Sequence, residues 1–92
     1  MSASDRGEIA AEFLVEPFVE GSPGPHVTAA VDAFADHDLS VDLGPFASTV
    51  TGDIDELAEA VGEMIRAAMK NGATSIQLRV ASSPEELSLI HI

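Results

Sequence analysis

The stretch LSVDLGPFASTVTG, residues 39–52, decides the fold of this chain. Residues alternate on both sides of a Gly44-Pro45 step, and one side of the alternation carries Leu39, Val41, Leu43, Phe46, Ser48 and Val50. A period of two is typical of a half-buried strand, and a Gly-Pro pair favours a tight turn. Residues 39–52 therefore predict a β-hairpin that ends at Gly52.

An amphipathic helix is predicted on each side of this hairpin. Residues 25–36 carry apolar side chains at i, i+3, i+4 and i+7, namely Val27, Ala30, Val31 and Phe34. Residues 53–70 form a longer pattern whose apolar face consists of Ile54, Leu57, Val61, Met64, Ile65, Ala68 and Met69. Asp53 suits the N-cap of this second helix. Gly62, near its middle, costs roughly 1 kcal/mol relative to Ala and suggests close packing against a neighbour.

Two further strands are expected, one within residues 8–19 and one over residues 75–80. The order of elements is then βαββαβ, which predicts an α+β fold, the ferredoxin-like sandwich. Right-handed crossovers place both helices on one face of an antiparallel sheet with the strand order 4-1-3-2.

The chain is short enough to form one domain. We assign residues 12–80 to this domain, residues 1–11 to a loose N-terminal segment, and residues 81–92 to a tail of uncertain structure. In the tail, Pro84 could start a short helix, or the apolar end could add an edge strand or cover a subunit interface. A domain of this size buries a modest core, and such domains often gain stability by oligomerising.

The two faces of the predicted sheet differ in character. The face toward the helices is apolar and carries Phe13, Val15, Leu39, Val41, Leu43, Phe46, Val50, Ile76, Leu78 and Val80. The opposite face is mixed and carries Glu12, Leu14, Glu16, Ser40, Asp42, Ala47, Thr49, Thr51, Gln77 and Arg79. Such a face suits burial against another subunit, and its two glutamates beside Thr49 suggest an acidic pocket for a cationic ligand. The simpler interpretation is that Arg79 pairs with one of these glutamates.

The charge of the chain narrows its choice of partners. Sixteen acidic residues against four basic ones give a net charge of −12. This balance argues against binding to nucleic acid or to an anionic membrane, and it favours a cationic small molecule or a basic protein. The acidity could equally serve solubility, because the composition is similar to that of proteins from a high-salt cytoplasm. No stretch resembles a signal peptide or a membrane helix, so a cytoplasmic location is expected.

No catalytic arrangement is apparent in the sequence. There is no cysteine, and none of His26, His37 and His91 has a partner at metal-ligand spacing. His37 is expected to cap a helix end and His26 to lie on the surface. We therefore expect no enzyme activity, no metal and no cofactor.

Several short motifs together resemble the small thiamine-binding protein family, which includes the thiamine- and hydroxymethylpyrimidine-binding YkoF type. They are EFLVEP at residues 12–17, a Gly/Ser loop followed by VTAAV at residues 27–31, LGP at residues 43–45 and TVTGD at residues 49–53. The resemblance covers residues 12–80. It implies a ferredoxin-like protomer that pairs into dimers and often tetramers, and non-catalytic binding of thiamine or its pyrimidine moiety.

The chemistry of such a ligand suggests which side chains would bind it. Thiamine carries a cationic thiazolium ring and an aminopyrimidine, so carboxylates, hydroxyls and apolar walls are all useful. The predicted ligand-binding residues are Glu12, Glu16, Pro17, Pro45, Phe46, Ser48 and Thr49. Two alternatives stay open: an acidic structural or regulatory module that binds a basic protein, and an enzyme of cofactor metabolism.

Overall fold

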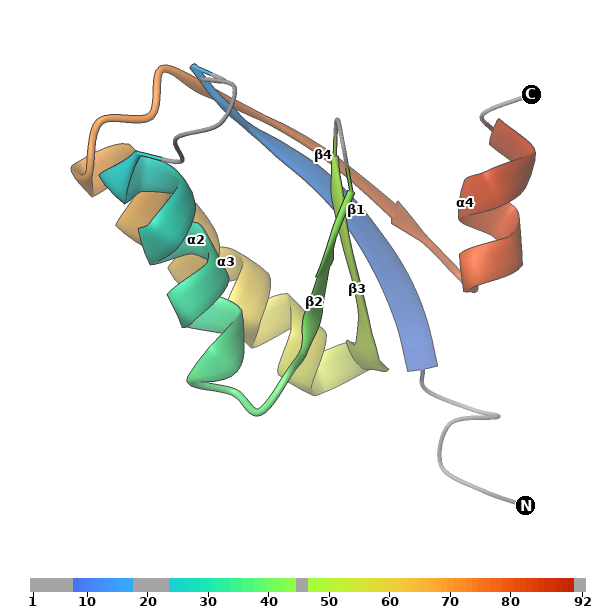
Figure 1. Cartoon of the computed structure of the whole chain (residues 1–92). Coiled ribbons are helices and arrows are strands. Elements are labelled where there is room, and N and C mark those ends of the chain that lie inside the picture. Colours follow the sequence, from blue (N-terminus) through green and yellow to red (C-terminus); the bar gives the residue numbers. More distant parts are fainter. Residues whose placement is uncertain (1–7, 18–23, 45–46, 91–92) are drawn as a thin grey trace.

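The computed structural model of the chain describes residues 8–17, 24–44 and 47–90 (Figure 1). The elements are β1 (Glu8–Glu16), α2 (Pro25–Ala35), β2 (Val41–Leu43), β3 (Ser48–Asp53), α3 (Ile54–Lys70), β4 (Ser75–Ala81) and α4 (Pro84–Ile90). The predicted βαββαβ order is confirmed, and a short helix follows it. Strand β1 begins at Glu8, so residues 8–11, which the sequence assigned to the N-terminal segment, pair with β3.

The four strands form one antiparallel sheet in the order β2-β3-β1-β4. This is the predicted order, with β1 and β3 as central neighbours. Glu12 on β1 lies opposite Thr49 on β3 and opposite Arg79 on β4. Directly opposed residues share a face of the sheet, so this register fixes which side chains can meet.

The start of α3 shows how local sequence sets an element. The Asp53 carboxylate accepts hydrogen bonds from the backbone N–H groups of Asp55, at 3.1 Å, and Glu56, at 3.3 Å. These donors have no partner within the helix, so the carboxylate satisfies them as an N-cap. The predicted role of Asp53 is confirmed.

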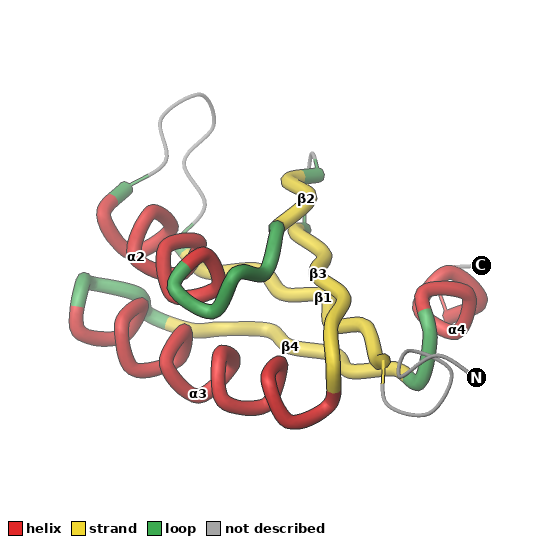
Figure 2. Tube along the Cα trace, turned by 90° about the horizontal axis from the view of Figure 1, so that it is seen from below, coloured by secondary structure: helices red, strands yellow, loops and turns green. Residues whose placement is uncertain are grey.

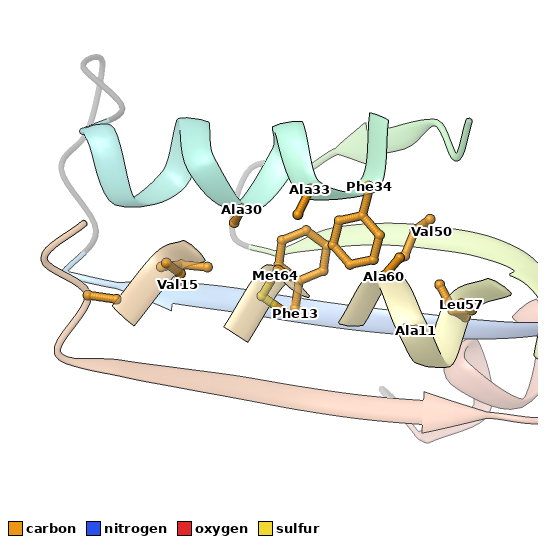
Figure 3. Close-up of a cluster of buried hydrophobic side chains, with 12 residues drawn as sticks. Ala11, Phe13, Val15, Ala30, Ala33, Phe34, Val50, Leu57, Ala60 and Met64 are labelled. Atoms are coloured by element: carbon orange, nitrogen blue, oxygen red, sulfur yellow. The ribbon is translucent and has the colours of Figure 1, made fainter. Parts of the chain in front are cut away.

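The hydrophobic core lies between the two long helices and the central strands (Figure 3). Its largest fully buried side chains are Phe34, Leu57, Met64 and Val50. Phe13 of β1 stacks on Phe34 of α2 with ring centroids 5.1 Å apart. Burying a side chain of this size contributes about 1.5–3 kcal/mol, so these few residues supply much of the stability of a small domain.

The prediction from the sequence overestimated how far the hydrophobic core extends across the sheet. Leu43, Leu78 and Val80 were expected to lie in the interior on the helix-facing side, but they are 64%, 38% and 52% exposed. The register does place Leu78 and Val80 on that side, opposite Phe13 and Ala11. No residue of β4 belongs to the buried core cluster. The helices cover the central strands and leave the edges of the sheet open.

Helix α4 contacts β1 and β4 and lies apart from α2 and α3 (Figure 1). Leu87 of α4 is buried, and so is Ala10 of β1. Ala10 is next to the core residue Ala11 in the strand, so its side chain lies on the opposite face of the sheet. The tail therefore forms the short helix that Pro84 could start, and it covers one end of the sheet.

Candidate functional site

The face of the sheet turned away from α2 and α3, which we call the open face, carries a cluster of polar side chains. Adjacent positions on three strands bring Glu12, Thr49 and Arg79 into one row, and Asp42 of β2 extends the row beyond Thr49. The next row toward the end of β1 is Leu14 with Gln77, and Glu16 with Ser75 follows. Polar groups on a rigid sheet are held in fixed relative positions, which suits recognition of a small molecule.

A hollow of about 250 Å³ opens on this part of the sheet. It is lined by Glu12, Phe13, Leu14, Ala47, Gln77, Leu78 and Arg79. The Glu12 side chain is only 18% exposed, and its Oε1 lies 3.9 Å from Nη1 of Arg79. The expected pairing of Arg79 with a glutamate is therefore found, and the pair forms one wall of the hollow.

Glu16 provides a second negative charge along β1. Its Oε1 accepts hydrogen bonds from Oγ of Ser75, at 2.6 Å, and from Nε2 of Gln77, at 3.4 Å. These bonds, the one from Ser75 first, lower the pKa of the Glu16 carboxyl, because they favour its charged form. The two hydrogen bonds therefore stabilise the charged form of Glu16 and fix its position on the open face.

The structure distributes the predicted ligand-binding residues over two faces. Glu12, Glu16 and Thr49 share the open face, as their alternation indicates. Ser48 lies one position along β3 from Thr49, so it faces the helix layer, where it cannot join them. Pro17 follows β1 directly, and its carbonyl oxygen is engaged by His26 at 2.7 Å.

Two predicted residues, Pro45 and Phe46, lie outside the described residues. Four residues that line the hollow were assigned to the open face by their alternation but were left out of the predicted ligand set: Leu14, Ala47, Gln77 and Arg79. The signal that identifies them is the pairing of β1 with β4, which the predicted strand order already contained.

His26 and His37 make separate contacts within the fold and do not form a common site. His26 was expected on the surface, but it is buried, and its Nε2–H donates to the Pro17 carbonyl. His37 was expected to cap a helix end; instead its Nδ1 lies 2.6 Å from Glu56 and its Nε2 lies 2.5 Å from Glu63, both on α3. These carboxylates, Glu56 first, raise the pKa of His37 to about 8.

Within the described ranges, no group of three or more His, Cys, Asp and Glu side chains is arranged to hold a metal ion. None of the described helices has the length and apolar character needed to cross a membrane.

Comparison with protein families gives one match that covers most of the chain. The model of a family described as "Thiamine-binding protein" matches residues 11–84. This range begins within β1 and ends at the first residue of α4. It contains every residue that lines the hollow.

Solved structures share the fold at low sequence identity. A protein from Methanocaldococcus jannascii of no assigned function is 20% identical, with a TM-score of 0.61, over 91% of this chain and 96% of its own. A domain of unknown function from Bacillus cereus is 19% identical, with a TM-score of 0.60, over 80% of this chain and 72% of its own. A Thermotoga maritima protein named for thiamine biosynthesis or salvage is 19% identical, with a TM-score of 0.53, over 92% of this chain and 99% of its own. A search of curated proteins found no match.

Proposed function

The chain belongs to the thiamine-binding protein family, and we propose that it binds thiamine or the hydroxymethylpyrimidine moiety of thiamine, without catalysis, as a small cytoplasmic homo-oligomer. The observation that carries this proposal is the hollow on the open face that is lined by the shielded Glu12 carboxylate. A ligand bound there would lie against a rigid antiparallel sheet.

The charges around the hollow favour a cation. Glu12 is mostly shielded from solvent, and hydrogen bonds from Ser75 and Gln77 stabilise the charged form of Glu16. A half-buried carboxylate interacts more strongly with a positive ring than an exposed one, because less water screens the pair. Arg79 is the basic group of this cluster, and it lies against Glu12. The thiazolium ring of thiamine fits this balance, and the Thr49 hydroxyl suits the polar atoms of the pyrimidine.

The size of the hollow also bears on the mode of binding. Cavities that enclose drug-sized ligands usually have volumes of roughly 300–1,000 Å³. The hollow of about 250 Å³ is smaller, so one subunit would leave part of a thiamine molecule exposed. This supports the homo-oligomeric part of the proposal, since a second subunit would add contact to the ligand.

Paired substitutions on β1 and β3 test the site. We expect Glu12→Gln to weaken thiamine binding by about 10-fold or more, because it removes a partly buried negative charge that would face the cationic ring. Thr49→Val should weaken binding less, by a few-fold. Ser48→Ala is the matched control, since Ser48 neighbours Thr49 but faces the helix layer. Unchanged affinity in both Glu12→Gln and Thr49→Val, measured by isothermal titration, would exclude this site.

A third variant separates ligand recognition from a purely structural ion pair. If Glu12 serves a cationic ligand, Arg79→Gln removes a competing charge and should leave thiamine binding unchanged or tighter. If the Glu12–Arg79 pair only stabilises the sheet, the two single variants should have similar effects on stability and neither should act specifically on binding. Titration and thermal unfolding of the same two proteins distinguish these cases.

A further inference from the structure

The charged side chains of the open face are mostly acidic. The face carries Glu12 and Glu16 on β1 and Asp42 on β2, against Arg79 on β4. Among the described residues, which do not include Arg6, the one Arg or Lys side chain on this face is Arg79. The proposed ligand exists in chemical forms of different charge, so this balance bears on which form the hollow accepts.

Arg79 is already held by a carboxylate. Its Nη1 lies 3.9 Å from Oε1 of Glu12, and both side chains line the hollow. The Glu12 side chain is 18% exposed and that of Arg79 is 37% exposed, so the pair is partly shielded from solvent. An anion that used Arg79 would have to compete with Glu12 and would lie beside its negative charge.

The other basic residues of the described chain lie away from the open face. Arg66 and Lys70 are on α3, which packs beside α2 in the layer that covers the other side of the sheet (Figure 2). They line a separate hollow of about 330 Å³ toward the C-terminal end of α3, together with Glu63, Ala67 and Asn71. The sheet therefore separates both basic side chains from a ligand on the open face.

The acidic groups of the open face are close enough to act together on one ligand. Glu12 and Asp42 lie in the same row, two strands apart, and Glu16 is four positions along β1 from Glu12. Given the spacing of strands and of residues along them, Asp42 lies about 10 Å and Glu16 about 14 Å from Glu12 across the sheet. The bonds from Ser75 and Gln77 stabilise the charged form of Glu16. A ligand in the hollow is therefore within the field of all three carboxylates.

We propose that the open-face site accepts thiamine as the unphosphorylated cation and rejects its phosphate esters through charge. A phosphate monoester carries a charge of about −1.5 to −2 at neutral pH. Proteins recognise such groups with arginine, lysine or backbone N–H groups. On the open face the phosphate would lose hydration and meet carboxylates in place of basic groups. This inference rests on the proposed function and adds the chemical form of its ligand.

Titration of the wild-type protein with a series of ligands tests the inference. The series is thiamine, thiamine monophosphate and O-acetylthiamine, an ester that adds bulk at the same hydroxyl without a negative charge. We expect O-acetylthiamine to bind within about 3-fold of thiamine, and thiamine monophosphate to bind at least about 10-fold more weakly than thiamine in low-salt buffer. The gap should narrow in concentrated salt, since the Debye length falls to about 3 Å at about 1 M.

A charge reversal locates the effect on the open face. Asp42→Lys replaces an exposed acid on the edge strand β2, where lysine is well tolerated. It should strengthen the binding of thiamine monophosphate relative to thiamine by about 3-fold or more. Asp32→Lys is the matched control, because it makes the same change in net charge at an exposed position of α2, in the helix layer. It should leave the ratio of the two affinities unchanged.

The outcomes separate this inference from the proposed function. Binding of thiamine with rejection of the phosphate ester alone, relieved by Asp42→Lys, supports selection by charge. Affinities for thiamine and its monophosphate that differ by less than about 10-fold overturn the inference and leave the proposed function standing. Equal rejection of both esters, or equal effects of the two lysine variants, also overturns it. If thiamine itself does not bind, the proposed function fails, and this inference fails with it.

Discussion

At the scale of single residues, the buried ring of His26 joins the start of α2 to the end of β1. Its Nε2–H donates to the Pro17 carbonyl, and the ring packs against Gly24. A Cβ atom at Gly24 would lie 2.6 Å from Cε1 and 2.8 Å from Nδ1 of His26. A larger residue at this position would therefore have to displace the His26 ring.

Gly24→Ala should therefore displace the His26 ring and break its bond to Pro17. Leaving a buried polar group unsatisfied costs about 1–3 kcal/mol, so we expect the free energy of unfolding to fall by this amount. Thr28→Ala, on the exposed side of the same helix, should change it by less than about 0.5 kcal/mol. Urea unfolding of the three proteins provides the comparison, and equal stability of Gly24→Ala and wild type would refute the account of this contact.

His37 makes stability depend on pH. In the folded state Glu56 and Glu63 raise its pKa from 6.5 to about 8, so protonation favours folding. The contribution is present in full below pH 6.5 and is lost as the pH rises through 8. We expect urea unfolding to show falling stability across this window in the wild type and a smaller fall in His37→Gln. Equal slopes in the two proteins would mean that the contacts of His37 with α3 do not stabilise the fold.

At the scale of elements, α3 depends on its N-cap. Asp53→Ala should lower the free energy of unfolding by about 1 kcal/mol, because two backbone N–H groups lose their acceptor. Asp53→Asn keeps a side-chain oxygen at the same place and should restore most of the loss. If Asn destabilises as much as Ala does, the negative charge of Asp53 acts on the helix dipole and the hydrogen bonds matter little.

Hydrophobic patterns predicted the helices and strands well, because helices and strands repeat their apolar residues with different periods. The alternation over residues 39–52 indicated both hairpin strands, and the strand order followed from the handedness of the crossovers. The burial of β4 could not be predicted in this way, since Leu78 and Val80 have the same alternation as covered residues. Their exposure depends on how far α3 reaches across the sheet, which is a property of the packed helices.

The candidate site was predicted only in part, for a related reason. Alternation correctly places Glu12, Glu16 and Thr49 on one face. Ser48 was included because its hydroxyl could donate to a ring nitrogen of the ligand, although its position in the alternation points to the helix layer. Gln77 lies more than 60 residues from Glu12 and meets it only through the pairing of β1 with β4.

At the scale of the whole molecule, the net charge of −12 opposes folding and association. Salt screens this self-repulsion, with a Debye length that falls to about 8 Å at physiological ionic strength. We expect the melting temperature to rise as sodium chloride is added to a low-salt buffer. A melting temperature that falls with salt would mean that ion pairs such as Glu12–Arg79 outweigh the repulsion.

Calorimetric titration of the wild-type protein with thiamine tests the central claim most directly. It should be made at low and at multi-molar salt on a sample shown to be folded. We predict saturable binding at a fixed ratio per subunit under both conditions, weaker at high salt, and competition by hydroxymethylpyrimidine. The absence of binding under either condition would contradict the assignment of a thiamine site to the open face.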